Sequence, residues 1–186
     1  MAGCTVKRAL GLRVVLILVA LACWSPAGAV ETTVGPSGLA MPRYVSLKSD
    51  RVNVRKGPGL TYPIAWVYGR AGLPVEVIQE YDNWRQIRDS EGATGWVLHS
   101  LLSGRRTGLI LPWEIKTASA SGAEPVGADI HESSSTSSNV IAIAQAGTLA
   151  SVLSCDVKWC RIVIGDRRGW IEQSKLWGVY KDETIR

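Results

Sequence analysis

The chain has 186 residues, with 21 Lys and Arg against 16 Asp and Glu and a formal net charge of +5. Three of the basic residues and none of the acidic ones fall within the first 29 positions, which leaves 18 basic against 16 acidic residues in the remainder. Binding to nucleic acid requires a clustered basic patch. A nearly balanced chain therefore predicts no nucleic-acid partner.

Residues 1–29 have the pattern of a secretory signal peptide. Basic residues precede an apolar run from Val14 to Trp24, which is 11 residues long, and a bilayer of about 30 Å needs roughly 20. The small residues Ala27-Gly28-Ala29 then match a cleavage site. We expect cleavage there, with no membrane span in the mature protein. The alternative is a lipoprotein signal acylated at Cys23, which is less favoured because Ala20 stands where that signal requires Leu.

One segment of the chain occurs twice. The stretch DNWRQIRDSEGATGWVLHSLL, Asp82 to Leu102, has a second copy in WCRIVIGDRRGWIEQSKL, Trp159 to Leu176. The offset between the copies is 75 residues at the first Trp and 74 at the Gly-Trp pair. Repetition of this kind indicates two copies of one small domain.

The first copy alternates apolar and polar residues over short runs that are separated by turn residues. This pattern is typical of half-buried strands, and 99–102 suggests a single helical turn. Many short strands with almost no helix predict a small antiparallel barrel, which leaves few exposed edges. The expected strands are 43–48, 51–55, 64–68, 74–80, 84–88, 94–98 and, as a closing strand, 106–111.

The motifs of the first copy resemble those of the bacterial SH3 (SH3b) domain family. Asn53-Val54-Arg55 precedes Gly57-Pro58, Trp84 follows a tight turn, and Gly95-Trp96 follows in the family's order. The resemblance implies an all-β protein of two tandem SH3-like barrels after the signal peptide. It also implies attachment to cell-wall peptides or to a partner protein, outside the cytoplasm of a Gram-negative cell.

The composition suggests where the domains begin and end. A stretch rich in Gly, Pro and small residues after the signal is expected to be a flexible lead-in, and the Ala- and Ser-rich segment TASASGAEP a flexible linker. The expected divisions are 1–29 (signal), 30–42 (lead-in), 43–113 (first domain), 114–125 (linker) and 126–182 (second domain).

The second copy keeps the barrel pattern but loses the loop motif. Asp129 replaces Asn53, His131 replaces Arg55, and serines replace the Gly-Pro pair. If that loop contacts the ligand, only the first domain binds in the family manner. The expected strands of the second copy are 140–144, 149–154, 160–164 and 169–172.

Two cysteines follow the signal, Cys155 and Cys160. A two-residue turn at Val157-Lys158 makes them a cross-strand pair with a Cα separation of ~4.5 Å, within reach of a disulfide. Such a bond is permitted in an exported protein. The aligned residues of the first copy, Glu80 and Arg85, form an opposite-charge pair. We favour a structural disulfide.

A zinc site or a reactive thiol are the alternatives for these cysteines. Zinc requires about four ligands, and only His99 and His131 are available as histidines. A cysteine nucleophile would need one free cysteine beside one of those histidines. The chain also lacks the His-Glu-x-x-His, Gly-x-Ser-x-Gly and phosphate-loop motifs. We therefore predict no catalysis, no metal and no cofactor.

Aromatic and polar residues of the first copy are the candidates for ligand binding. Trp and Tyr combine apolar area with a polar group, which suits half-exposed surfaces. Trp84 and Trp96 recur in the second copy, so we favour a role in the core for them. Tyr62 and Trp66 have no aromatic counterpart there and are better candidates. The full candidate set is Asn53, Arg55, Tyr62, Trp66, Trp84 and Trp96.

Three functions fit this pattern, in decreasing order of preference. The first is a periplasmic or secreted, non-catalytic binding or scaffold protein for cell-wall peptide (peptidoglycan). The second is a periplasmic adaptor that joins an envelope complex or a wall enzyme. The third is a cysteine-dependent wall hydrolase.

Overall fold

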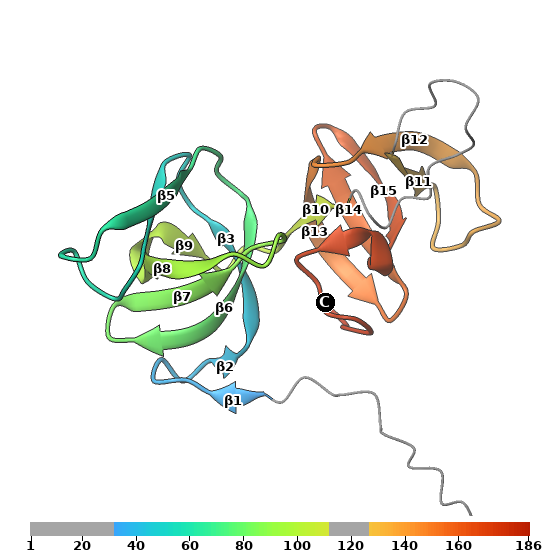
Figure 1. The fold of residues 1–186 in the computed structure, drawn as a ribbon. Helices are drawn as coiled ribbons and strands as arrows, with labels where there is room; N and C mark the ends of the chain where they lie inside the picture. The colour runs from blue at the N-terminus through green and yellow to red at the C-terminus, as the bar shows by residue number, and fades with distance from the viewer. Residues whose placement is uncertain (1–31, 112–126) are drawn as a thin grey trace, which may run out of the picture. The chain divides into compact units, whose positions relative to one another are not determined.

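The computed structural model describes residues 32–111 and 127–186. They form two seven-stranded antiparallel sheets and one short hairpin (Figure 1). The only helical elements in this part of the chain are single 3₁₀ turns, η1 (His99–Leu101) and η2 (Gln173–Lys175), and neither could cross a membrane. The prediction of two SH3-like all-β domains is confirmed. The expected signal peptide and linker lie outside the described residues.

The first sheet contains the strands expected for the first copy, except the closing one. Its strand order is β5-β4-β8-β7-β6-β3-β9. The tight turn between β6 and β7 is present, with Tyr81 paired to Trp84 and Asp82 at a φ of 48°. The bounds are β3 (Arg43–Leu47), β4 (Val52–Arg55), β5 (Ile64–Tyr68), β6 (Pro74–Tyr81), β7 (Trp84–Arg88), β8 (Thr94–Leu98) and β9 (Leu102–Ser103).

The second sheet repeats this topology strand for strand. Its order is β12-β11-β15-β14-β13-β10-β16, so each strand has a counterpart at the same place in the first sheet. The bounds are β10 (Thr107–Ile110), β11 (Gly127–His131), β12 (Val140–Gln145), β13 (Leu149–Asp156), β14 (Trp159–Ile164), β15 (Arg167–Glu172) and β16 (Leu176–Trp177).

The strand expected to close the first barrel belongs instead to the second. β10 pairs with β13 and β16, as β3 pairs with β6 and β9. It is therefore the first strand of the second copy, and the segment expected to link the domains falls between the first two strands of that copy. The expectation for 106–111 was wrong because β10 is separated from its own barrel's next strand by residues 111–126.

Each barrel has its own apolar core, built from the inward positions of alternating strands. In β4, Val52 and Val54 are fully buried, while Asn53 and Arg55, which alternate with them, are half-buried. The first core contains Val45, Leu47, Val52, Val54, Val75, Val77, Ile87 and Val97. The second contains Ile110, Ala128, Ile130, Ala144, Ala150, Val152, Cys155, Cys160, Ile162, Ile171, Leu176 and Val179.

The lead-in is more ordered than expected. β1 (Thr33–Val34) pairs with β2 (Ala40–Met41) to form a hairpin. Its turn is tied to the first barrel, because the Ser37 amide and hydroxyl donate hydrogen bonds of 2.9 and 2.8 Å to the Glu80 carboxylate. A buried carboxylate requires such donors, and this explains why a segment without hydrophobic periodicity is held in place.

Candidate functional site: the outer faces of the two barrels

The strand register places part of the candidate set in one row across the first barrel. Arg55 on β4 pairs with Trp96 on β8, and Trp96 pairs with Gln86 on β7. Directly paired residues share one face of a sheet, and this face is opposite to the one that carries Val54 and Val97. Asn53 lies two positions from Arg55 and therefore shares the outer face.

Trp84 lies in the next row of the same face, paired with Leu98. It is 8% exposed, as is its counterpart Trp159 in the second barrel. Trp96 is half-buried. The two tryptophans thus form a largely covered aromatic base on this face, and only Trp96 presents substantial surface.

The Gly-Pro-Gly loop packs against Tyr62. A side chain at Gly57 would collide with the Tyr62 ring, and one at Gly59 would come within 3.3 Å of it. Arg55 closes the loop, since its guanidinium donates a 2.6 Å hydrogen bond to the Tyr62 carbonyl. Tyr62 remains 46% exposed. Arg55 and Tyr62 therefore lie together, and both stabilise the conformation of the loop.

Trp66 is separated from the outer-face candidates. It pairs with the buried Val54 and so points to the inner side of the barrel. There it packs against the core, beside Gly95, and meets the Tyr68 ring edge-on at 6.0 Å between centroids. Its position is that of a core side chain.

The second barrel retains the conformation of the loop without its sequence. Ser135 donates a backbone hydrogen bond to Ser133, and Ser138 to Ser135. In the first barrel Gly59 bonds to Gly57, and Tyr62 to Gly59, in the same way. The Ser138 hydroxyl also accepts a bond from the Ser133 amide. Small polar side chains thus replace the packing of an aromatic ring on glycines.

His131 closes the loop of the second barrel as Arg55 closes that of the first. Its Nδ1 lies 3.1 Å from the Ser138 carbonyl, the counterpart of the Tyr62 carbonyl. Its ring also meets Trp159 edge-on, with 5.2 Å between centroids. The loop of the second barrel therefore keeps its conformation although it lacks the motif residues. The sequence alone did not indicate this.

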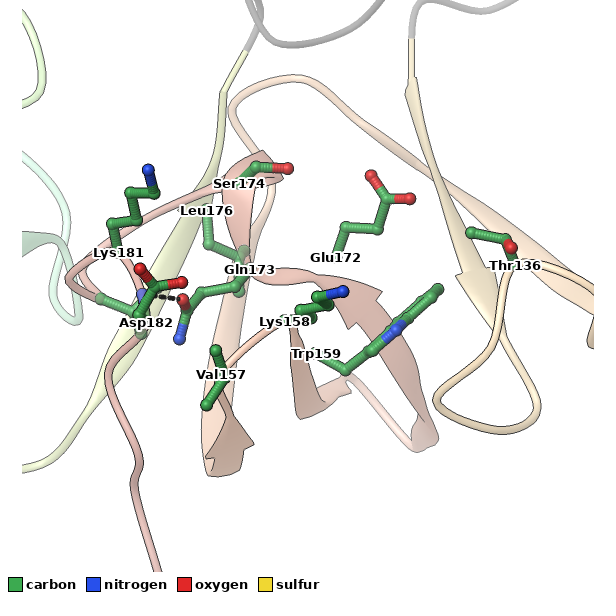
Figure 2. A pocket seen from close by; sticks show the side chains of 11 residues that line it. Thr136, Val157, Lys158, Trp159, Glu172, Gln173, Ser174, Leu176, Lys181 and Asp182 are labelled. Carbon is green, nitrogen blue, oxygen red and sulfur yellow. Dashed lines mark hydrogen bonds between the residues drawn. The ribbon is translucent and has the colours of Figure 1, made fainter.

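A groove of about 520 Å³ lies on the outer face of the second barrel, beside Trp159 (Figure 2). The loop supplies Thr136, the β13–β14 turn supplies Val157 and Lys158, and β15 supplies Glu172. On the other side the C-terminal segment closes the groove, and its Asp182 amide donates a 2.7 Å hydrogen bond to the Gln173 side chain. Further lining residues are Ser174, Leu176, Val179 and Lys181.

The groove carries both signs of charge around an aromatic residue. Lys158 and Lys181 are exposed, as is Asp182, and Glu172 is half-buried. These residues were absent from the candidate set. The only signal for them was their position beside the second copy of the Trp84 motif, and the return of the C-terminal segment to this face has no sequence signature.

The β6–β7 and β13–β14 hairpins confirm the predicted register. Cys155 pairs with Cys160 and forms a disulfide, with Cα atoms 4.1 Å apart. At the same place in the first barrel, the Arg85 guanidinium lies 3.0 Å from the Glu80 carboxylate. Burial would raise the pKa of Glu80, but hydrogen bonds from Ser37 and Arg43 outweigh it and lower the pKa to about 2.

The described residues contain no group of three or more His, Cys, Asp or Glu side chains that could hold a metal ion. Both cysteines in this part of the chain are bonded to each other. The two outer faces offer aromatic surface, charged groups and hydrogen-bond donors, which are suited to recognition.

Comparison with known proteins supports the repeat. The family model described as "Bacterial SH3 domain" matches residues 48–104 and 125–178, more than half of the chain. The chain is 28% identical over 130 residues to the Bacillus subtilis (strain 168) protein named "Putative N-acetylmuramoyl-L-alanine amidase YrvJ". That alignment covers 67% of this chain and 24% of YrvJ, so the chain spans about a quarter of its curated relative.

Two solved structures also resemble it. NlpC2 from Trichomonas vaginalis matches with 15% identity and a TM-score of 0.31, over 75% of this chain and 48% of NlpC2. An NlpC/P60 family protein from Bacillus cereus ATCC 10987 matches with 10% identity and a TM-score of 0.30, over 74% of this chain and 57% of that one.

Proposed function

This chain belongs to the bacterial SH3 domain family, and from that premise we propose that it is an exported, non-catalytic protein that binds cell-wall peptide. Its place is outside the cytoplasmic membrane, in the periplasm or at the wall. A relative named as a muramoyl-alanine amidase, matched over a quarter of its length, supports a setting in which wall peptide is the common ligand.

The groove beside Trp159 carries this proposal. Wall stem peptides are short, extended and zwitterionic, with free carboxylates and amino groups along one chain. Lys158 and Lys181 on the groove complement the carboxylates, and Glu172 complements an amino group, through charge-assisted hydrogen bonds. Trp159, although only 8% exposed, lines the groove and supplies part of its apolar base.

The first barrel offers a different surface at the same place. Asn83 and Leu98 occupy the positions of Lys158 and Glu172, as the pairing of Trp84 with Leu98 and of Trp159 with Glu172 shows. Its polar contribution comes from Arg55, which pairs with Trp96, and from Asn53 on the same face of β4. We therefore propose that the second barrel recognises charge on the peptide and that the first adds a less charged contact through Tyr62 and Trp96.

A hydrolase based on cysteine chemistry fits the site poorly. Nucleophilic attack requires a thiolate, and Cys155 and Cys160 share a disulfide. Neither of them offers a free sulfur in this state. The proposed function is for this reason recognition alone.

Co-sedimentation of the mature chain with purified sacculi tests the proposal. We expect enrichment over an unrelated periplasmic protein, with Lys158→Glu and Glu172→Lys each reducing it several-fold and Arg55→Ala and Tyr62→Ala reducing it less. Lys48→Glu is the matched control, because it makes the same charge change at an exposed site outside the groove.

Two results would contradict the proposal. One is sedimentation no greater than that of the unrelated protein. The other is release of soluble wall fragments by the purified chain, in which case Cys160→Ser would show whether the cysteines are involved.

A further inference from the structure

The inner sides of the two barrels differ at two positions, on the equivalent edge strands β5 and β12. In the first barrel Trp66 and Tyr68 of β5 pair with Val54 and Val52. In the second, the same places on β12 are taken by alanines: Ala142 pairs with Ile130, and Ala144 pairs with Ala128. Two aromatic rings are thus replaced by two methyl groups.

The rings of the first barrel fill space and find polar partners. Trp66 packs beside Gly95, where an added side-chain carbon would come within 3.1 Å of the indole. The Tyr68 hydroxyl donates a 2.8 Å hydrogen bond to Asp89. In the second barrel the counterpart of Asp89, the residue after the Arg88 position, is Ile164. The polar partner has been lost together with the ring.

The second barrel has a cavity of about 330 Å³ where those rings would lie. Most of its lining is apolar, from Ala142, Ala144 and isoleucines of β11, β12 and β14. Gln145 and Thr148 add polar groups, and Arg167 is the one charged residue among those that line it. A pocket with mostly apolar walls and a few polar groups accepts an apolar or aromatic guest. The pocket next to the rings in the first barrel differs in having the polar residues Asp89, Ser90 and Glu91 among its lining, beside apolar residues such as Leu73 and Val75.

One wall of this cavity is an unpaired sheet edge. β12 stands at the end of its sheet and, among the described strands, pairs only with β11. Val140, Ile141 and Ile143 on this strand are 49%, 42% and 48% exposed. An apolar edge strand with free backbone groups is a template for adding a further strand.

We propose that this edge binds an extended peptide segment of a protein partner, which pairs with β12 and inserts an aromatic side chain into the cavity. The aromatic anchor follows from the first barrel, where a Trp and a Tyr occupy the equivalent space. An acidic residue beside the anchor would complement Arg167. The site shares no lining residue with the Trp159 groove, and it extends the function beyond wall binding to recruitment of a second protein.

Methyl NMR of the mature chain, labelled at isoleucine δ1 carbons, tests this proposal. The probe is a capped six-residue peptide with Trp flanked by Val and Glu. We expect the Ile141, Ile143 and Ile164 methyls to shift while those of Ile64 and Ile87 in the first barrel do not. Replacing the Trp of the peptide by Ser should weaken binding about tenfold or more, since an aromatic anchor dominates such contacts.

Protein variants separate the anchor from its surroundings. Ala142→Trp restores the first barrel's residue, fills the cavity and should abolish the shifts. Ala65→Trp, on the equivalent edge of the first barrel, is the matched control and should leave them unchanged. Arg167→Glu, at an exposed position where folding is not at stake, should weaken the acidic peptide and not a peptide with Gln in place of Glu.

Several results would overturn the proposal. These are the absence of shifts at the cavity methyls, equal shifts in Ala142→Trp, or equal binding by a peptide whose backbone amides are methylated. Soluble wall peptide producing the same shifts would also overturn it, because the cavity would then belong to wall binding. Loss of sacculus binding with these shifts intact would contradict the proposed function and leave this one standing.

Discussion

The two barrels stabilise equivalent hairpins by different interactions. In the first, a buried ion pair joins β6 to β7, and in the second a disulfide joins β13 to β14. Glu80, which is 7% exposed, also receives Arg43 at 2.7 Å and the hydrogen bonds of Ser37. One fold thus tolerates either a network of charges or a single covalent bond at this place.

The acidic partner of the equivalent arginine also differs between the barrels. Arg106 precedes β10 as Arg43 begins β3, and it pairs with Glu183 of the C-terminal segment at 2.8 Å. Burial raises the pKa of Glu183, but Arg106 and the Tyr180 amide outweigh it and lower the pKa. The same segment bonds through Ile185 to Cys155. The acidic partner has moved from the hairpin to the chain end, and each hairpin is covered by a terminal segment from outside its barrel.

Removing the buried acid should produce the largest effect. Glu80→Gln leaves two arginines without their carboxylate, and we expect the first barrel to lose roughly 3 kcal/mol at pH 7, since each pKa unit is worth ~1.4 kcal/mol and the Glu80 pKa is lowered from 4.5 to about 2. Amide hydrogen exchange at Val77 and Ile87 measures this locally.

The pH dependence identifies Glu80 as the cause. A lowered folded-state pKa contributes stability that is fully present above the unfolded pKa near 4.5 and is lost as pH falls toward 2. The difference between wild type and Glu80→Gln should therefore shrink over that interval. Glu91→Gln, at an exposed turn position, is the control and should have little effect. A difference that stays constant down to pH 2 would show that packing, not charge, is responsible.

Removing the disulfide should have a smaller effect, confined to the second barrel. The closed loop is short, so the Cys155→Ser and Cys160→Ser double variant should lose about 2 kcal/mol. Exchange at Ile162 and Ile171 reports it. Unlike the loss at Glu80, this one should not vary between pH 4.5 and 2, and reductant should reproduce it in the wild type but not in the variant. Equal loss in both barrels would contradict independent fastening of the hairpins.

The same comparison explains which parts of the fold could be predicted from sequence. Strand alternation and the Trp and Gly-Trp positions located six strands of the first barrel, and alignment of Glu80 and Arg85 with the cysteines established the hairpin register. β10 was assigned to the wrong barrel because Arg43 and Arg106 are offset by 63 residues, whereas the later strands are offset by 74 to 76. An insertion inside a repeat conceals its first strand.

The candidate site was only partly predictable, for a physical reason. Motif residues such as Arg55 and Tyr62 were identified because they are side chains of a recognisable loop. The groove beside Trp159 depends on Lys181 and Asp182, which reach it through a chain reversal held by Gln173. The cavity beside Ala142 exists because small side chains stand where the first barrel has rings, and an alanine in a strand gives no sign of the space that it leaves.

The smallest predicted effect concerns the loop that both barrels share. If His131 and Arg55 perform one task, Arg55→His should keep the hydrogen bond to the Tyr62 carbonyl and cost little stability, whereas Arg55→Ala should cost about 1 kcal/mol, the net worth of one hydrogen bond. Exchange of the Tyr62 amide, which bonds to Gly59, measures loop opening. Lys56→Ala is the neighbouring control, because Lys56 is exposed and holds the loop through its backbone. If Arg55→His opened the loop as much as Arg55→Ala does, the shared role of His131 and Arg55 would be contradicted. The charge of Arg55 would then matter for contact with a ligand and not for closing the loop.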